Sequence, residues 1–206
     1  MHEFKDPSRL TRLAVISVWV YLAAEILNGL ISLYGFASPD ALLDPNTLLI
    51  AAFSQIAAGF VMVASTIVVG CWIYRVSANA HVLSDDMTIS PGWAVGWYFV
   101  PFANLVKPYQ GMKEAWMASH FRDNWHGEPT PALLGWWWGL WLVTNILANI
   151  SFRIAMEYPD EFTPAPVAFF DMVAAVLTIP LCLILITMMQ RLCHAQLYAR
   201  HDETFA

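Results

Sequence analysis

The stretch that decides the fold is SPGWAVGWYFVPFANLVKP, residues 90–108, in the middle of the chain. It is apolar and aromatic, and three prolines interrupt it, at Pro91, Pro101 and Pro108. By length alone, the uncharged run 87–106 could cross a lipid bilayer, which takes ~20 apolar residues. Whether it crosses decides how many spans the protein has and on which side of the membrane each loop lies.

The chain as a whole is too apolar for a soluble domain of its length. It has 206 residues, of which 58% are hydrophobic and 13% charged, so we predict an all-α integral membrane protein. The ten Lys and Arg residues are scattered and form no basic stripe, which argues against a nucleic-acid partner. Cys71, Cys182 and Cys193 form no C-x-x-C pair, and we expect them to be reduced and packed as small apolar side chains.

Four apolar runs are long enough to be transmembrane helices. They cover residues 13–36, 47–74, 132–152 and 167–189. Short connections rich in Pro, Asn and Asp predict that they form two helical hairpins within one transmembrane domain, residues 1–206. Basic residues precede the first run as in a signal peptide, but its 24 residues exceed a cleavable segment, and we expect it to be retained.

The distribution of Lys and Arg favours four spans over five. With four spans and a cytoplasmic N-terminus, nine of the ten basic residues are cytoplasmic and only Arg153 lies outside. A fifth span would split them five and five. The positive-inside rule therefore predicts four spans with both termini in the cytoplasm.

Under four spans, residues 90–108 are predicted to enter and leave the membrane on one side. Ser90 and Pro91 can begin a helix whose ten residues, to Val100, rise ~15 Å, about half of the hydrocarbon core. Pro101 stops that helix, and residues 102–106, if extended at ~3.3 Å each, return the chain to Lys107. Such a re-entrant segment must be covered by protein or line a wet cavity.

The next segment, residues 108–121, is predicted to be an amphipathic helix lying along the inner membrane surface. At helical spacing, Tyr109, Met112 and Trp116 share one face, and the polar side chains share the other. The polar set is Gln110, Lys113 and Glu114.

A long set of residues in this region resembles a known family. WIYR at 72–75, Asn79, the segment 91–108 and WMAS at 116–119 are similar to a bacterial membrane-protein family catalogued as domain of unknown function 4328. The residues that carry the resemblance are Trp72, Arg75, Asn79, Pro91, Gly92, Trp93, Gly96, Trp97, Pro101, Asn104, Lys107, Pro108 and Trp116. The resemblance implies a protein of the bacterial inner membrane and supplies no catalytic residue.

The sharpest polar feature is Glu25, in the middle of the first span, where an ionisable side chain is costly and marks a functional candidate. A weak internal repeat aligns residues 25–31 with 145–151 and places Asn145 at the same depth. The predicted intramembrane polar site is Glu25, Asn28, Gln55 and Asn145. It has three interpretations: a helix-packing hydrogen bond worth ~0.6 kcal/mol, a proton or cation site, or a lipid or cofactor contact.

Other polar residues have simpler interpretations. Arg75, Arg191, Lys107 and Lys113 are predicted to contact lipid headgroups. Asp171 and Arg153 are expected to form an ion pair near the outer interface. His81, His120, His126 and His194 have no metal-ligand spacing, so we expect surface histidines. We predict no metal, no cofactor and no catalytic residue, since no nucleophile or phosphate-binding motif is present.

The leading functional hypothesis is a non-enzymatic accessory, scaffolding or assembly subunit of a bacterial inner-membrane complex, associating with other subunits or with itself. The alternative is a small channel or transporter whose pathway is lined by the re-entrant loop and Glu25. A third reading is a lipid-binding or lipid-modifying protein. No sequence motif separates these classes.

Overall fold

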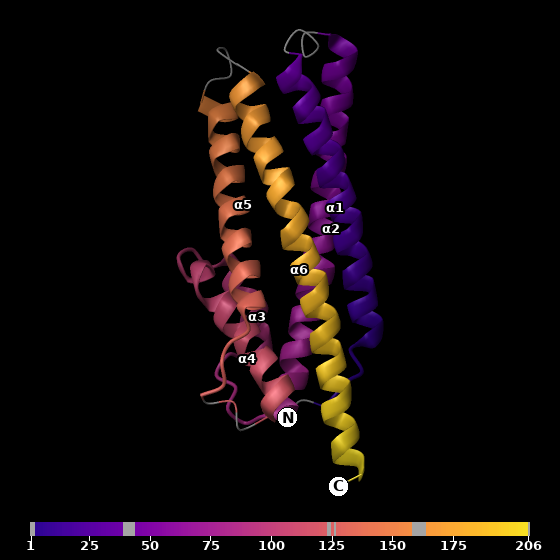
Figure 1. Ribbon diagram of the computed structural model, residues 1–206, viewed down its shortest axis with the longest axis vertical. Coiled ribbons are helices and arrows are strands. Elements are labelled where there is room, and N and C mark those ends of the chain that lie inside the picture. The colour runs from indigo at the N-terminus through magenta and orange to yellow at the C-terminus, as the bar shows by residue number, and fades with distance from the viewer. Residues whose placement is uncertain (1–2, 39–43, 123–124, 126, 158–163, 206) are drawn as a thin grey trace. The chain divides into compact units, whose positions relative to one another are not determined.

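The computed structural model describes residues 3–38, 44–122, 125, 127–157 and 164–205, with backbone alone for 164–166 and 201–205. Within these ranges the chain is helical and has no strand. The elements are α1 (Ser8–Ala37), α2 (Pro45–Leu83), α3 (Pro91–Gly96), η2 (Trp97–Phe99), η3 (Ala103–Leu105), α4 (Lys107–Phe121), α5 (Ala132–Glu157) and α6 (Pro164–Phe205). The long helices are α1, α2, α5 and α6, and the shorter helices α3 and α4 lie between α2 and α5 in the sequence, as labelled in Figure 1.

The prediction of four spans is confirmed. α1, α2, α5 and residues 167–200 of α6 are long and apolar enough to cross a membrane. α2 and α6 continue for several turns beyond the predicted ends because apolar residues recur there at helical spacing and are buried, among them Val76, Leu83 and Leu192. Pro180 lies inside α6, and proline is tolerated in membrane helices where its neighbours satisfy the freed backbone groups.

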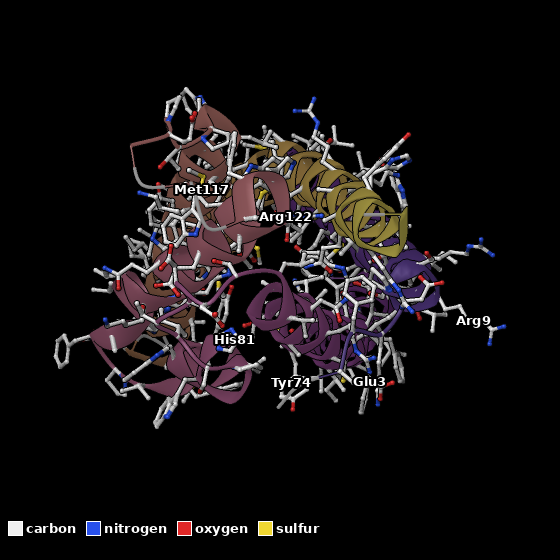
Figure 2. The ribbon with its side chains drawn as sticks, turned by 90° about the horizontal axis from the view of Figure 1, so that it is seen from below. Glu3, Arg9, Tyr74, His81, Met117 and Arg122 are labelled. Carbon is white, nitrogen blue, oxygen red and sulfur yellow. The ribbon has the colours of Figure 1, made fainter. Side chains whose placement is uncertain are left out.

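The chain divides into two compact units. Unit 1 comprises residues 1–16, 66–138 and 184–206, and unit 2 comprises residues 17–65 and 139–183. Unit 1 therefore holds both chain ends and the whole connector between α2 and α5. Figure 2 labels residues of this unit, among them Glu3 of the N-terminal segment, His81 of α2 and Arg122 at the end of α4.

Unit 1 is built around a buried polar network. The Asn79 side chain donates 3.0 Å to the Gln196 side chain, which in turn donates 2.8 Å to the Val76 carbonyl and 3.1 Å to the Ser119 hydroxyl. Asn79 also exchanges hydrogen bonds with the backbone of Lys5, at 2.8 and 3.1 Å. The network fixes the N-terminal segment, α2, α4 and α6 to one another.

The same network brings the two flanks of the connector together. Asn79 precedes the segment 90–108 and Ser119 follows it, and both bond to Gln196. The residues before and after this segment therefore lie close together, as expected if the chain does not cross the membrane between them. The entry of this segment into the bilayer stays a prediction.

The expected extended return at residues 102–106 is wrong. The helix from Pro91 ends at Gly96, η2 follows, and Ala103–Leu105 forms a second 3-10 turn. Ala103 donates 2.7 Å to the Pro101 carbonyl, and Asn104 donates 2.9 Å to that of Val100. A turn satisfies backbone groups locally, which a single extended strand away from water cannot do.

α4 coincides with the predicted helix at 108–121, but its apolar surface packs into unit 1. Met112 and Trp116 are buried as one face, and Ala115, Met117 and Ala118 extend the buried surface around the helix. α4 contacts α3 and the 3-10 turns. Most of its apolar side chains are therefore covered by protein, and Phe121 at its end is exposed. A position at the membrane surface stays a prediction.

Candidate intramembrane polar site

In unit 2, α1 and α6 approach each other closely. A Cβ added at Gly29 would lie 2.7 Å from the Cβ of Ala175, which is closer than real Cβ atoms come. The two helices run in opposite directions, as their colour gradients in Figure 1 show. Small residues at such a crossing let membrane helices pack backbone against backbone.

This crossing sets the register of the polar side chains around it. Glu25 lies one helical turn from Gly29, and Asp171 lies one turn from Ala175, so the antiparallel directions place the two carboxyl groups on opposite sides of the crossing. Their separation along the helix axis is ~12 Å, at 1.5 Å per residue. Asn28 falls between them. We call Tyr21, Glu25, Asn28, Ser151 and Asp171 the polar ladder.

Each carboxyl group in the ladder has a hydroxyl partner. The Tyr21 hydroxyl donates to the Glu25 carboxyl from one turn earlier on α1. The Ser151 hydroxyl donates 2.6 Å to Asp171 across α5 and α6. Asp171 acts electrostatically on Glu25, and Glu25 acts in the same way on the buried Cys182. Both carboxyl groups are half-buried.

No basic side chain balances these carboxyl groups within unit 2. Residues 17–65 and 139–183 contain one basic residue, Arg153, and its side chain is exposed. The expected ion pair between Arg153 and Asp171 is therefore replaced by the bond from Ser151. A bare charge at the bilayer centre costs about 3 kcal/mol, and unit 2 offers the Glu25 carboxyl group no basic side chain to offset this cost.

Asn28 adds an unsatisfied acceptor. Its side chain is 8% exposed, and its Oδ1 has no hydrogen-bond partner in the described part of the chain. An unmade hydrogen bond at a buried polar atom costs about 1–3 kcal/mol. The oxygen therefore lies where a donor or a cation would be bound favourably.

The structure brings together only half of the predicted site. Glu25 and Asn28 share the α1 face toward α6, whereas Gln55 on α2 and Asn145 on α5 are exposed. The Asn145 amide donates 2.8 Å to the Trp141 carbonyl of its own helix. Sequence reasoning missed Tyr21 and Ser151. Tyr21 could have been predicted, because it lies four residues before Glu25 and therefore on the same helix face. The pairing of Ser151 with Asp171 could not, because it depends on how α5 and α6 are aligned along their axes.

The family-like motif residues serve the packing of unit 1. The buried Trp72 donates 3.1 Å to the Thr11 hydroxyl, and Trp93 stacks on Trp97 with ring centroids 4.4 Å apart. Asn79 belongs to the Gln196 network. Together these residues hold α2 and the connector in place.

The predicted headgroup and histidine residues also lie in unit 1. Arg75, Lys107 and Lys113 are half-buried, and Arg191 is exposed. The His120 ring stacks on Trp116 and is within 2.8 Å of the Trp116 carbonyl. Among the residues that the structure describes, no three His, Cys, Asp or Glu side chains gather as a metal site. His126 lies outside the described residues.

Comparison with protein families identifies the chain. The model of the domain of unknown function DUF4328 matches residues 41–194, well over half of the sequence. The protein belongs to the DUF4328 family. A search of curated proteins and a search of solved structures found no match.

The DUF4328 match includes every motif residue from Trp72 to Trp116 and also Ser151 and Asp171. It begins after α1, so Tyr21, Glu25 and Asn28 lie outside the matched range. The polar ladder thus combines the DUF4328 region with a helix that precedes it.

Proposed function

We propose that this DUF4328 protein moves protons or another small monovalent cation in the membrane, with the Glu25 carboxyl group as the carrier. The observation that carries the proposal is a half-buried carboxyl group at the middle of a membrane helix with no basic partner in unit 2. Ionisable side chains in such positions mark ion pathways and proton relays. Asp171 is a second carboxyl group on the same ladder and extends the path by two helical turns.

The test is ion flux into liposomes that contain the purified protein. An imposed pH or cation gradient should decay faster with the wild-type protein than with empty liposomes. Glu25→Gln keeps the shape and the Tyr21 contact but removes the titrating group, so the flux should fall to that of empty liposomes. Glu157→Gln, an exposed acidic residue at the end of α5, is the matched control and should retain flux. Equal flux in wild type and Glu25→Gln would overturn the proposal.

We also propose that residues 90–108 dip into the bilayer from the side that holds both termini. Support comes from the turn between η2 and η3, where Phe99 is 74% and Phe102 is 86% exposed. Large apolar side chains so exposed are stable in lipid and costly in water. The sequence predicts a pathway lined by both this loop and Glu25. The loop belongs to unit 1 and Glu25 to unit 2, and the proposed carrier site does not include the loop.

An accessory or assembly role is the second candidate, and one observation favours it. Asn145 and Asn149 are exposed on α5, where each amide donates 2.8 Å to a carbonyl one turn earlier. Amide side chains on the outside of a membrane helix gain a hydrogen bond from a second helix. The Asn145→Cys variant should then form a cross-link to a partner subunit or to a second copy of the protein in isolated bacterial inner membranes. If this variant forms no cross-linked product, the accessory role is excluded.

A further inference from the structure

Resting on the proposed function, we propose that Glu25 and Asn28 form a binding site for one small alkali cation, of the size of Na⁺. The site consists of the Glu25 carboxylate and the Asn28 Oδ1 on adjacent turns of α1. The Tyr21 hydroxyl is hydrogen-bonded to the same carboxyl group from the preceding turn of α1. The ion bound here would be the ion that the protein transports or couples to. The Glu25 carboxyl group by itself does not distinguish a proton from a metal cation.

The geometry of an α-helix brings these groups together. Residues three and four apart lie on one face, and helical side chains lean toward the N-terminus of their helix. The Asn28 amide therefore leans toward the turn that carries Glu25, and Glu25 leans toward Tyr21, with which it is hydrogen-bonded. A single ion between Asn28 and Glu25 contacts both oxygens without any change of helix backbone.

The chemistry of the donors selects a hard monovalent cation. All the atoms are oxygens, which hard cations prefer over nitrogen or sulfur ligands. One carboxylate and one neutral carbonyl oxygen give a net charge that a single positive charge cancels, as a low-dielectric site requires. Asn28 Oδ1 has no donor in the described part of the chain, so a bound ion would satisfy a buried atom that is otherwise unpaired.

The packing next to the site limits the size of the ion. Gly29 follows Asn28 directly and touches Ala175 of α6, so the two helix backbones are close at this level. Little room is left for a large ion, which favours Na⁺ and Li⁺ over K⁺. Asp171 lies on the far side of the crossing and is bonded to Ser151, so it is not a ligand of this ion.

Thermal unfolding of the detergent-purified full chain tests the site. The protein is titrated with NaCl at constant ionic strength, with choline chloride as the replacement salt. Tm should rise with Na⁺ in a saturable way. Asn28→Leu and Glu25→Gln should abolish the rise. Asn145→Leu, which removes an exposed amide from another helix, should keep it.

Three outcomes would overturn the inference: no Na⁺-dependent shift in the wild type, a shift that Asn28→Leu retains, or a response to ammonium and none to Na⁺. If Asn28→Leu fails to fold, Asn28→Asp replaces it. That variant keeps an oxygen in place and adds a negative charge. The Na⁺ concentration at half of the maximal Tm rise should therefore be lower than in the wild type. An unchanged concentration would contradict the site. Proton flux that persists without any Na⁺ effect would overturn this inference and leave the proposed carrier intact.

Discussion

Gln196 is a single side chain that joins three helices of unit 1. It is fully buried and bonds to Asn79 and the Val76 carbonyl on α2 and to Ser119 on α4. From sequence alone, a glutamine in this polar stretch of α6 would be placed at the protein surface. In the structure it provides partners for groups that would otherwise be buried and unpaired.

Replacing Gln196 with Leu should destabilise the protein by about 2 kcal/mol, because the Val76 carbonyl and one Asn79 amide proton lose a buried partner. Unfolding in a denaturing detergent, followed by circular dichroism, measures the loss. Gln190→Leu on the same helix is the control, since Gln190 is exposed and should change stability little. Equal losses in both variants would show that the network contributes no stability.

Asp44 stabilises the start of α2 to an extent that depends on pH. Its carboxylate accepts hydrogen bonds from the Thr47 backbone amide and hydroxyl, each 3.0 Å long, and so caps the first turn of α2. These bonds lower the pKa of Asp44 below its usual 3.8. A lowered pKa means that the stabilisation is present above pH 3.8 and is lost as the pH falls through the lower value in the folded protein.

Asp44→Ala should therefore speed hydrogen exchange at the amides of Thr47 and Leu48 at neutral pH. The difference from wild type should shrink as the pH falls below 3.8, where the wild-type cap protonates. Asp44→Ser should protect these amides at every pH, because Ser caps helices without titrating. A difference between wild type and Asp44→Ala that does not change with pH would contradict the capping role.

At the scale of elements, the long helices follow from sequence and their contacts do not. Runs of ~20 apolar residues are sufficient to predict spans, and all four were found. Which face of a span turns inward depends on packing. Asn145 and Gln55, which the sequence predicts to face inward, are therefore exposed. The prediction of an extended segment at 102–106 is wrong, because the backbone there forms local hydrogen bonds in a 3-10 turn.

The α1–α6 crossing offers the sharpest test of an element contact. Gly29→Ala puts a Cβ against the rigid Cβ of Ala175 and should cost about 1–3 kcal/mol by overpacking. This loss exceeds the ~1 kcal/mol that Ala gains over Gly in a helix. Gly59→Ala on α2, where the added Cβ meets nothing within 4 Å, should be neutral or stabilising.

A compensating substitution at Ala175 distinguishes the loss of the Gly29–Ala175 contact from any other effect of changing Gly29. Ala175→Gly removes the opposing Cβ, so the double variant with Gly29→Ala should regain most of the lost stability. The free energies of unfolding of the four proteins in this cycle give the coupling directly. Additive losses would mean that α1 and α6 do not meet at these residues.

At the scale of the whole molecule, the contacts of unit 1 join segments from both ends of the sequence to the connector. The Arg200 guanidinium lies 5.0 Å from the centre of the Phe4 ring, so the two ends of the chain are neighbours. Arg122 at the end of α4 donates to the Ala199 carbonyl beside them. We therefore expect the connector and both termini to share one side of the membrane, and the positive-inside rule predicts that this side is the cytoplasm.

Reporter fusions in a bacterium should follow this topology. Alkaline phosphatase, which is active only outside the cytoplasm, should be inactive after Arg200 and after Gly127 in the connector, and active after Glu157 at the end of α5. A fluorescent protein that matures only in the cytoplasm should give the opposite pattern. Phosphatase activity after Gly127 would mean that residues 90–108 cross the bilayer. The Asn79, Gln196 and Ser119 bonds could not then all form, because Asn79 and Ser119 would lie on opposite sides of the membrane.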